Sequence, residues 1–276
     1  MLTSFTPRLD ILPKAQRRLW AELGGTPREF TLYGDTAIAL RLGHRQSADF
    51  DFFARIPFEP DSLLKKIPYL KNAVVRQSSP NTLTTTIDRG GAVQVSFFGG
   101  LNLGQVEASD FIEDPNLAVA SLIDLAGTKA KVIIQRVEPK DYVDIHALMT
   151  IGGIPLAKML AAASVIFGPQ INPLDALKAI AYHQDTALTG LSDKVKTNLV
   201  RAVQATDPEN LPSLSPIKLS NRIELRPPFR VQFRPPAGER TRGSDGAETG
   251  VAEPHIAEQS RSWRTASGER EVMRGS

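Results

Sequence analysis

The chain has 276 residues, of which 41% are hydrophobic and 23% charged, and this ordinary globular composition excludes a wholly disordered protein. It contains no cysteine, which excludes disulfide scaffolds, cysteine zinc sites, iron–sulfur clusters and cysteine nucleophiles. The 33 basic and 30 acidic residues give a net charge of only +3, so nucleic-acid binding would require a localised basic patch.

The first hundred residues are predicted to alternate between helices and strands. Glycine and proline separate segments that show either helical spacing of apolar residues or alternation at period two. The helices are expected at 13–23, 36–42 and 60–67. The strands are expected at 29–33, 48–54, 82–88 and 92–98, and Arg89-Gly90-Gly91 joins the last two as a hairpin.

From residue 116 to about 205 the pattern turns helical. Helices are expected at 117–135, 140–149, 155–166, 173–183 and 192–205. Beyond residue 207 arginine, proline, glycine and serine replace the aliphatic residues, so this segment cannot bury enough apolar area to offset its ordering entropy. We therefore predict an α/β (α+β) fold with a small mixed β-sheet flanked by helices. Its parts are a core over 1–114, a helical region over 115–206 and a disordered tail over 207–276.

The sequence contains no segment typical of a membrane protein. No stretch approaches the ~18 consecutive apolar residues of a membrane span. The first twenty residues lack the charged-then-apolar order of a signal peptide. We therefore expect a cytoplasmic protein without a membrane partner.

Residues 32–53 carry the strongest chemical signal. A strand is predicted to end at Gly34, where the missing side chain lets the backbone approach a ligand, and the helix after it offers free N–H groups for a phosphate. Asp49 and Asp51 lie two apart on a predicted strand and so project from one face. Adjacent carboxylates repel unless protons or a divalent cation lie between them, and Mg²⁺ prefers oxygen ligands. This combination favours metal-assisted nucleotidyl transfer, although an Asp-x-Asp pair alone is usually a solvated strand face.

Two blocks of this sequence resemble a known family. Residues 34–52, GDTAIALRLGHRQSADFDF, resemble the AbiEii/AbiGii toxin family of the polymerase-β-like nucleotidyltransferase superfamily. Lys129, Arg136 and the run KDYVDIHAL at 140–148 follow in the order that the family has. The resemblance covers roughly residues 15–205. It implies that the core is a nucleotidyltransferase domain and that the helical region completes its active-site cleft.

The resemblance also implies roles for individual residues. Asp49 and Asp51 would be catalytic and bind the metal, Lys129 would reach the nucleotide phosphates, and Asp141 and Asp144, one helical turn apart, would complete the pocket.

The nucleotide phosphates would be bound around the predicted turn. Gly34, with its neighbours Asp35 and Thr36, would shape the triphosphate turn, and Arg45 and Ser47 lie just ahead of the metal pair.

Structural interpretations of the same residues remain open. Lys129 could be a surface lysine, and Asp141 and Asp144 could be first-turn acids that favour the helix dipole. Arg45 could pair with an acid of the strand. Neither His44 nor His146 is given a catalytic role.

The sequence departs from the superfamily at two places. Asp35 stands where a second glycine or a serine is usual, and a carboxylate beside a triphosphate is adverse unless it points away or caps the helix. Gln94 and Ser96 stand where a third carboxylate is usual. The acids that could substitute in space are Asp88, Asp141 and Asp144. Alternatively, only one metal is held firmly, or the chemistry has been lost.

The resemblance implies magnesium-dependent transfer of a nucleotide from an NTP, in some members to the acceptor end of tRNA. It also implies a toxin encoded beside a DNA-binding antitoxin. Two alternatives remain: a catalytically degenerate domain that binds nucleotide or protein, and an enzyme that nucleotidylates a small molecule such as an antibiotic. The fold alone cannot separate these functions.

Overall fold

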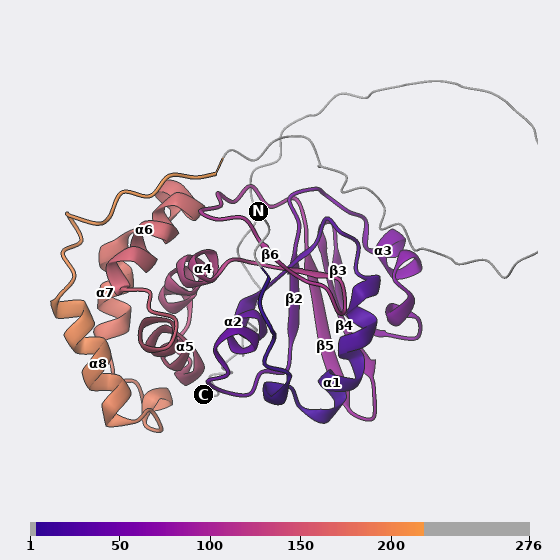
Figure 1. Cartoon of the computed structure of the whole chain (residues 1–276), viewed down its shortest axis with the longest axis horizontal. Helices are drawn as coiled ribbons and strands as arrows, with labels where there is room; N and C mark the ends of the chain where they lie inside the picture. Colours follow the sequence, from indigo (N-terminus) through magenta and orange to yellow (C-terminus); the bar gives the residue numbers. More distant parts are fainter. Residues whose placement is uncertain (1–3, 218–276) are drawn as a thin grey trace, which may run out of the picture. The chain divides into compact units, whose positions relative to one another are not determined.

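The computed structural model describes residues 4–217 (Figure 1). The predicted tail lies outside the described residues from residue 218 onward. Its first part, 207–217, has no helix or strand, but Leu211 and Leu214 pack against the core. Among the described helices, none has the length and apolar character needed to cross a bilayer.

A seven-stranded mixed sheet forms the centre of the described chain, in the order β3-β4-β5-β2-β1-β7-β6. The strands are β1 (Thr31–Tyr33), β2 (Phe50–Phe53), β3 (Val74–Ser79), β4 (Thr82–Asp88), β5 (Ala92–Phe98), β6 (Asp110–Ile112) and β7 (Leu117–Val119). Strand β2 pairs antiparallel with β1 and parallel with β5, so it lies in the interior of the sheet. The predicted mixed sheet with flanking helices is therefore confirmed.

Helices cover the sheet and extend beyond it on one side. They are α1 (Lys14–Trp20), α2 (Gly34–Leu42), α3 (Pro60–Lys66), α4 (Leu122–Gln135), α5 (Pro139–Thr150), α6 (Leu156–Phe167), α7 (Pro173–Ala181) and α8 (Asp193–Gln204). Helix α2 contacts both α4 and α5, and Figure 1 shows these two between α2 and the outer helices. The helical region thus meets the core along α2.

The alternation in β2 decides which side chains are free for chemistry. Phe50 and Phe52 are fully buried, and the Phe52 ring stacks on Phe97 with centroids 5.3 Å apart. Because successive residues of a strand point to opposite faces, Asp51 is left on the other face. Core packing of the phenylalanines therefore fixes the direction of this carboxylate.

The structure corrects the predicted start of the helix at 117–135. Leu117 and Val119 are buried in β7, which pairs with β6 and with β1, so the sheet continues past residue 114. The helix begins only after Ser121, whose side chain accepts a hydrogen bond from the Asp124 N–H. An apolar run of three residues before a cap is too short to show the period of a strand. The predicted division at residue 114 stays a prediction.

Candidate functional site

The junction of β1 and α2 lies directly against a carboxylate. Gly34 has φ +73°, and a Cβ added there would lie 2.8 Å from Oδ2 of Asp51. Such a distance is shorter than a carbon–oxygen contact allows, and a positive φ favours glycine. Gly34 therefore lies directly against the Asp51 carboxylate, and the predicted close approach of a ligand to this turn stays a prediction.

Asp49 and Asp51 form a carboxylate pair that has no ion pair among the described residues. Burial raises the pKa of Asp51 to about 6, the charges of Asp49 and Asp35 act in the same direction, and a hydrogen bond from Ser96 opposes them. Burial also raises the pKa of Asp49. Two desolvated carboxylates without a cationic partner are the donor set that a divalent cation satisfies.

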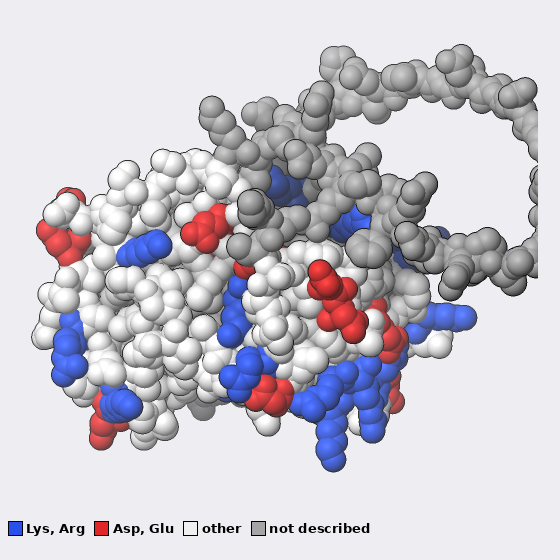
Figure 2. All heavy atoms as spheres, in the orientation of Figure 1, with Lys and Arg blue, Asp and Glu red and all other residues white. Residues whose placement is uncertain are grey.

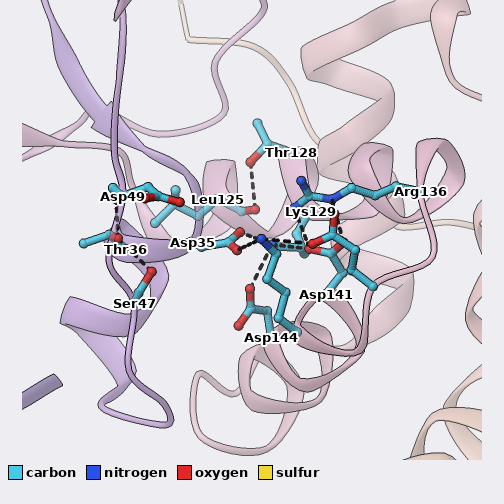
Figure 3. A network of polar contacts seen from close by, with 12 residues as sticks. Asp35, Thr36, Ser47, Asp49, Leu125, Thr128, Lys129, Arg136, Asp141 and Asp144 are labelled. Atoms are coloured by element: carbon cyan, nitrogen blue, oxygen red, sulfur yellow. Dashed lines mark hydrogen bonds and ion pairs between the residues drawn. The ribbon is translucent and has the colours of Figure 1, made fainter. Parts of the chain in front are cut away.

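Buried hydroxyl groups hold the backbone ahead of this pair (Figure 3). The Thr36 hydroxyl donates to the backbone carbonyl of Asp49, so the Ser47 hydroxyl, 2.8 Å from Thr36 Oγ1, donates to Thr36. Thr36 is 1% exposed and Ser47 7%. The structure therefore uses both hydroxyls to tie residues 47–49 to α2, and their predicted role toward phosphate stays a prediction.

Lys129 lies at the centre of a buried cluster (Figure 3). Its Nζ lies 2.5 Å from Asp35, 2.9 Å from Asp141 and 2.8 Å from Asp144, so each ammonium hydrogen faces a carboxylate. The Lys129 side chain is 2% exposed, which contradicts the alternative of a surface lysine. We call Lys129 with these three aspartates the lysine cluster.

The three carboxylates of the lysine cluster lie within 4.8 Å of one another, a spacing that could hold a metal ion. The ammonium of Lys129 already contacts all three. Burial alone would lower the pKa of Lys129, but the negative charges of Asp144, Asp35 and Asp141 outweigh it and raise this pKa. The Lys129 ammonium therefore occupies the position that a metal ion would take among these three carboxylates. Of the two groups of acids, Asp49 and Asp51 are thus the better candidates for binding a metal.

Three further cations surround the lysine cluster. Arg45 contacts Asp144 with two nitrogens, at 2.6 and 2.8 Å, and Asp35 at 3.0 Å. Arg136 contacts both oxygens of Asp141, at 2.9 and 3.1 Å. Lys140 lies 3.5 Å from Asp35. Arg45 therefore pairs with a helix acid and the α2 turn rather than with the strand.

Asp144 is the most heavily coordinated acid of the site. It accepts from Arg45 and Lys129, and His44 Nε2 lies 2.7 Å from its Oδ1. Burial alone would raise the pKa of Asp144, but the hydrogen bonds from His44 and Arg45 and the charge of Lys129 hold it well below its usual range. Asp144 and Asp141 are fully buried, so neither is merely a first-turn acid facing the helix dipole.

The charges of Asp35 and Lys140, at the lysine cluster, also act on the carboxylate pair. After burial, the largest cause, the charge of Asp35 raises the pKa of both Asp49 and Asp51, and the charge of Lys140 lowers both. Asp35 neither caps α2 nor points away from the site, which were the two arrangements considered for it. Its carboxylate contacts Lys129, Arg45 and Lys140 instead.

The place where a third carboxylate is usual is taken by Ser96 in the described structure. Ser96 lies beside Asp51 in the pairing of β2 with β5 and donates to it. Asp88 accepts from the N–H groups of Gly90 and Gly91 in the exposed β4–β5 turn and is no substitute. Among the described acids, Asp35 is the one whose charge acts on both members of the carboxylate pair.

Sequence reasoning gave no role to three residues that the structure brings here: His44, Arg136 and Lys140. Arg136 and Lys140 belong to the second motif block, but nothing in the spacing indicates which acid each contacts. His44 follows Gly43, which ends α2 with φ +65°. Its position after a glycine C-cap was the available signal that it leaves the helix near the site.

The family model described as "Nucleotidyl transferase AbiEii toxin, Type IV TA system" matches residues 18–213. An uncharacterized protein from Aquifex aeolicus (strain VF5) is 33% identical over 137 residues, which are 49% of this chain and 65% of that protein. The chain thus spans just under two thirds of the length of the curated relative it matches.

Two solved structures are similar. A candidate nucleotidyltransferase from H. pylori has a TM-score of 0.44 and 17% identity, covering 70% of this chain and 91% of that one. The nucleotidyltransferase toxin MenT4 from Mycobacterium tuberculosis H37Rv has a TM-score of 0.46 and 13% identity, covering 71% and 83%.

Proposed function

Since this chain belongs to the AbiEii nucleotidyl transferase toxin family of type IV toxin–antitoxin systems, we propose that it transfers a nucleotide from an NTP to an acceptor hydroxyl with a divalent cation. The observation that carries the proposal is the carboxylate pair, Asp49 and Asp51, beside the glycine turn at the start of α2. A substrate-binding turn and a metal-binding pair are thus adjacent, as the chemistry requires.

The residues present fit Mg²⁺ at the carboxylate pair. Both ligands are oxygen donors, the pKa of each is raised by burial, and neither has a cationic partner among residues 4–217. When bound there, the ion would neutralise charge that develops on the transferred phosphate. One pair of carboxylates, with Ser96 in place of a third, favours a site whose remaining ligands come from the substrate.

The phosphates of the NTP would lie at the N-terminus of α2. Free N–H groups and the helix dipole favour an anion there, and the nearest cations are Lys129, Arg45 and Lys140. In an in-line displacement the acceptor oxygen bonds to the α-phosphorus, the bond to pyrophosphate breaks and the hydroxyl proton is released. These cations would orient the phosphate chain for that attack.

We further propose that the acceptor is RNA, with tRNA as the first candidate. Figure 2 shows lysine and arginine gathered over α1, where Lys14, Arg17 and Arg18 are exposed and form no salt bridge among the described residues. This group of exposed cations supports the proposal, since the phosphates of nucleic acids are contacted by such side chains. The family description names a toxin–antitoxin system, so we also propose an antitoxin as partner.

The direct test is label transfer. Purified protein, Mg²⁺ and each α-labelled NTP in turn are incubated with total cellular RNA, and the products are separated on a denaturing gel. We expect a labelled band at tRNA size with at least one NTP, lost with EDTA and with Asp49 and Asp51 both changed to Ala. Asp88→Asn, an exposed acid outside the site, is the matched control and should retain transfer.

Other outcomes would replace parts of this proposal. Label in a small molecule, with the RNA unlabelled, would assign a small-molecule acceptor. Folded protein that labels nothing with any NTP would support the degenerate binding domain instead.

Gly34→Ala is expected to lose both transfer and stability. The positive φ alone costs an L-residue about 1 kcal/mol, and the new methyl group must also displace the Asp51 carboxylate. Gly153 has φ +66° with no atom within 4 Å of an added Cβ, so Gly153→Ala tests backbone strain alone. Thermal melts should show a loss of stability in both variants, larger in Gly34→Ala because of the displaced carboxylate, and label transfer should be lost only in Gly34→Ala. Equal transfer by the two would contradict the assignment.

A further inference from the structure

The place where the NTP phosphates would bind is already filled by a carboxylate of this chain. Asp35 lies in the first turn of α2, directly after Gly34. Its Oδ1 contacts Lys129 at 2.5 Å, and its Oδ2 contacts Arg45 at 3.0 Å and Lys140 at 3.5 Å. One carboxylate thus engages all three cations nearest the start of the helix.

We propose that Asp35 acts as an internal stand-in for a nucleotide phosphate, occupying these cations in the free protein and competing with the NTP for them. This inference rests on the proposed function, because it concerns the same site. It makes Asp35 a residue that sets nucleotide affinity, rather than a ligand of the substrate.

Exposure separates Asp35 from the other acids of the lysine cluster. The side chains of Asp141 and Asp144 are 0% exposed, whereas that of Asp35 is 20% exposed. Arg45 and Lys140, at 18% and 40%, are also reached by solvent. An incoming anion can therefore meet Asp35 and its two outer partners without opening the buried part of the cluster.

The balance of charge also fits an exchange of anions. The cations Lys129, Arg45, Arg136 and Lys140 are matched by the acids Asp35, Asp141, Asp144 and Glu138. If the Asp35 side chain rotated out of the cluster, all four cations would remain with one acid fewer. The cluster would then carry an excess of positive charge beside a helix N-terminus. A phosphate supplies the missing negative charge with the same hydrogen-bond chemistry.

The test is binding of inorganic tripolyphosphate, without metal, measured by calorimetry. This probe reports the phosphate cations alone and needs no turnover. We expect Asp35→Asn to bind tripolyphosphate about tenfold more tightly or better than the wild type, because a unit charge next to the anion has been removed. Asp61→Asn, an exposed acid of α3, controls for the change in net charge and should bind as the wild type does.

Unchanged or weaker binding by folded Asp35→Asn would overturn the proposal. If this variant does not fold, the wild type is labelled with a carbodiimide and glycinamide, and modification of Asp35 is read by mass spectrometry. Added tripolyphosphate should increase labelling of Asp35 if the phosphate displaces it. Labelling that stays constant or falls would show that Asp35 remains in place.

The outcomes separate this inference from the proposed function. A gain in tripolyphosphate affinity without any nucleotide transfer would leave the competition standing and remove the transferase. Transfer by the wild type, with no gain in affinity from Asp35→Asn, would remove only the competition.

Discussion

Asp51→Asn is expected to stabilise the metal-free protein while it abolishes nucleotide transfer. Burial and the charges of Asp49 and Asp35 raise the pKa of Asp51 to about 6, against a normal value of 3.8. An asparagine of the same shape removes the ionised form that the native state disfavours. Loss of a metal ligand removes several kcal/mol of transition-state stabilisation, or more than about a hundredfold in rate.

The raised pKa of Asp51 determines how the stability of the wild type changes with pH. The unfolded chain loses the Asp51 proton near pH 4, but the native state keeps it to about pH 6. Between these values the native state binds more protons, so the stability of the wild type falls as the pH rises. We expect Asp51→Asn to be more stable than the wild type. The difference in free energy of unfolding should be small below about pH 4, grow up to about pH 6 and stay constant above that pH.

The size of the gap follows from the shift. A change of two pKa units corresponds to ~3 kcal/mol, and partial exposure of Asp51 reduces this to about 2 kcal/mol. Melting in EDTA should then shift upward by about 4 to 8 °C at pH 7. Mg²⁺ should stabilise the wild type more than the variant. A variant that melts at a lower temperature than the wild type throughout this pH range would contradict the interpretation that the native state disfavours the ionised form of Asp51.

Lys129→Met is expected to be the most destabilising change at the site. It removes the ammonium from between three carboxylates, two of them fully buried. Removing one partner of a buried ion pair costs ~3 to 5 kcal/mol, because the charge left behind is uncompensated. That cost is a large part of the ~5 to 15 kcal/mol that stabilises a typical domain. The melting temperature should fall by about 10 °C or more.

Lys131→Met is the matched control for this variant. Lys131 lies on the same helix, and within residues 4–217 its Nζ donates to the backbone carbonyl of Gln170 alone. We expect a loss of at most ~1 kcal/mol there. The loss of stability in Lys129→Met should also become smaller as the pH falls, because protonation neutralises the three aspartates that have lost the ammonium between them. Similar melting curves for the two variants would show that the lysine cluster contributes little to folding.

The sequence predicted those elements whose signal is local. The hairpin at 82–88 and 92–98 has the predicted bounds, because β-branched runs flank a turn with two glycines. Strand β3 was missed because all six of its residues are exposed, so no alternation marks it. The strand at 117–119 was read as helix, since its partners β1 and β6 are what make it a strand.

The site residues likewise include some that local patterns predict and others whose contacts depend on tertiary packing. Gly34, Asp49 and Asp51 could be read from a turn and a period of two, both local in the chain. The contact between Asp35 and Lys129 joins residues 94 positions apart, and no spacing rule reaches that far. The hydroxyls of Thr36 and Ser47 are bonded inside the fold, which no local pattern indicated, and their role toward phosphate stays a prediction. Residue types indicated the chemistry, and only tertiary packing decided which acid meets which cation.

The separation of the two motif blocks has a consequence for synthesis of the chain on the ribosome. The carboxylate pair emerges early, with Asp49 just before β2 and Asp51 in it, but Arg45 meets its partner Asp144 only 99 residues later. Domains fold as their last required segment leaves the ribosome. A truncated or stalled product that ends before α5 would carry the carboxylate pair without Asp141 and Asp144, two of the acids that contact Lys129. We therefore expect such a product to lack transfer activity.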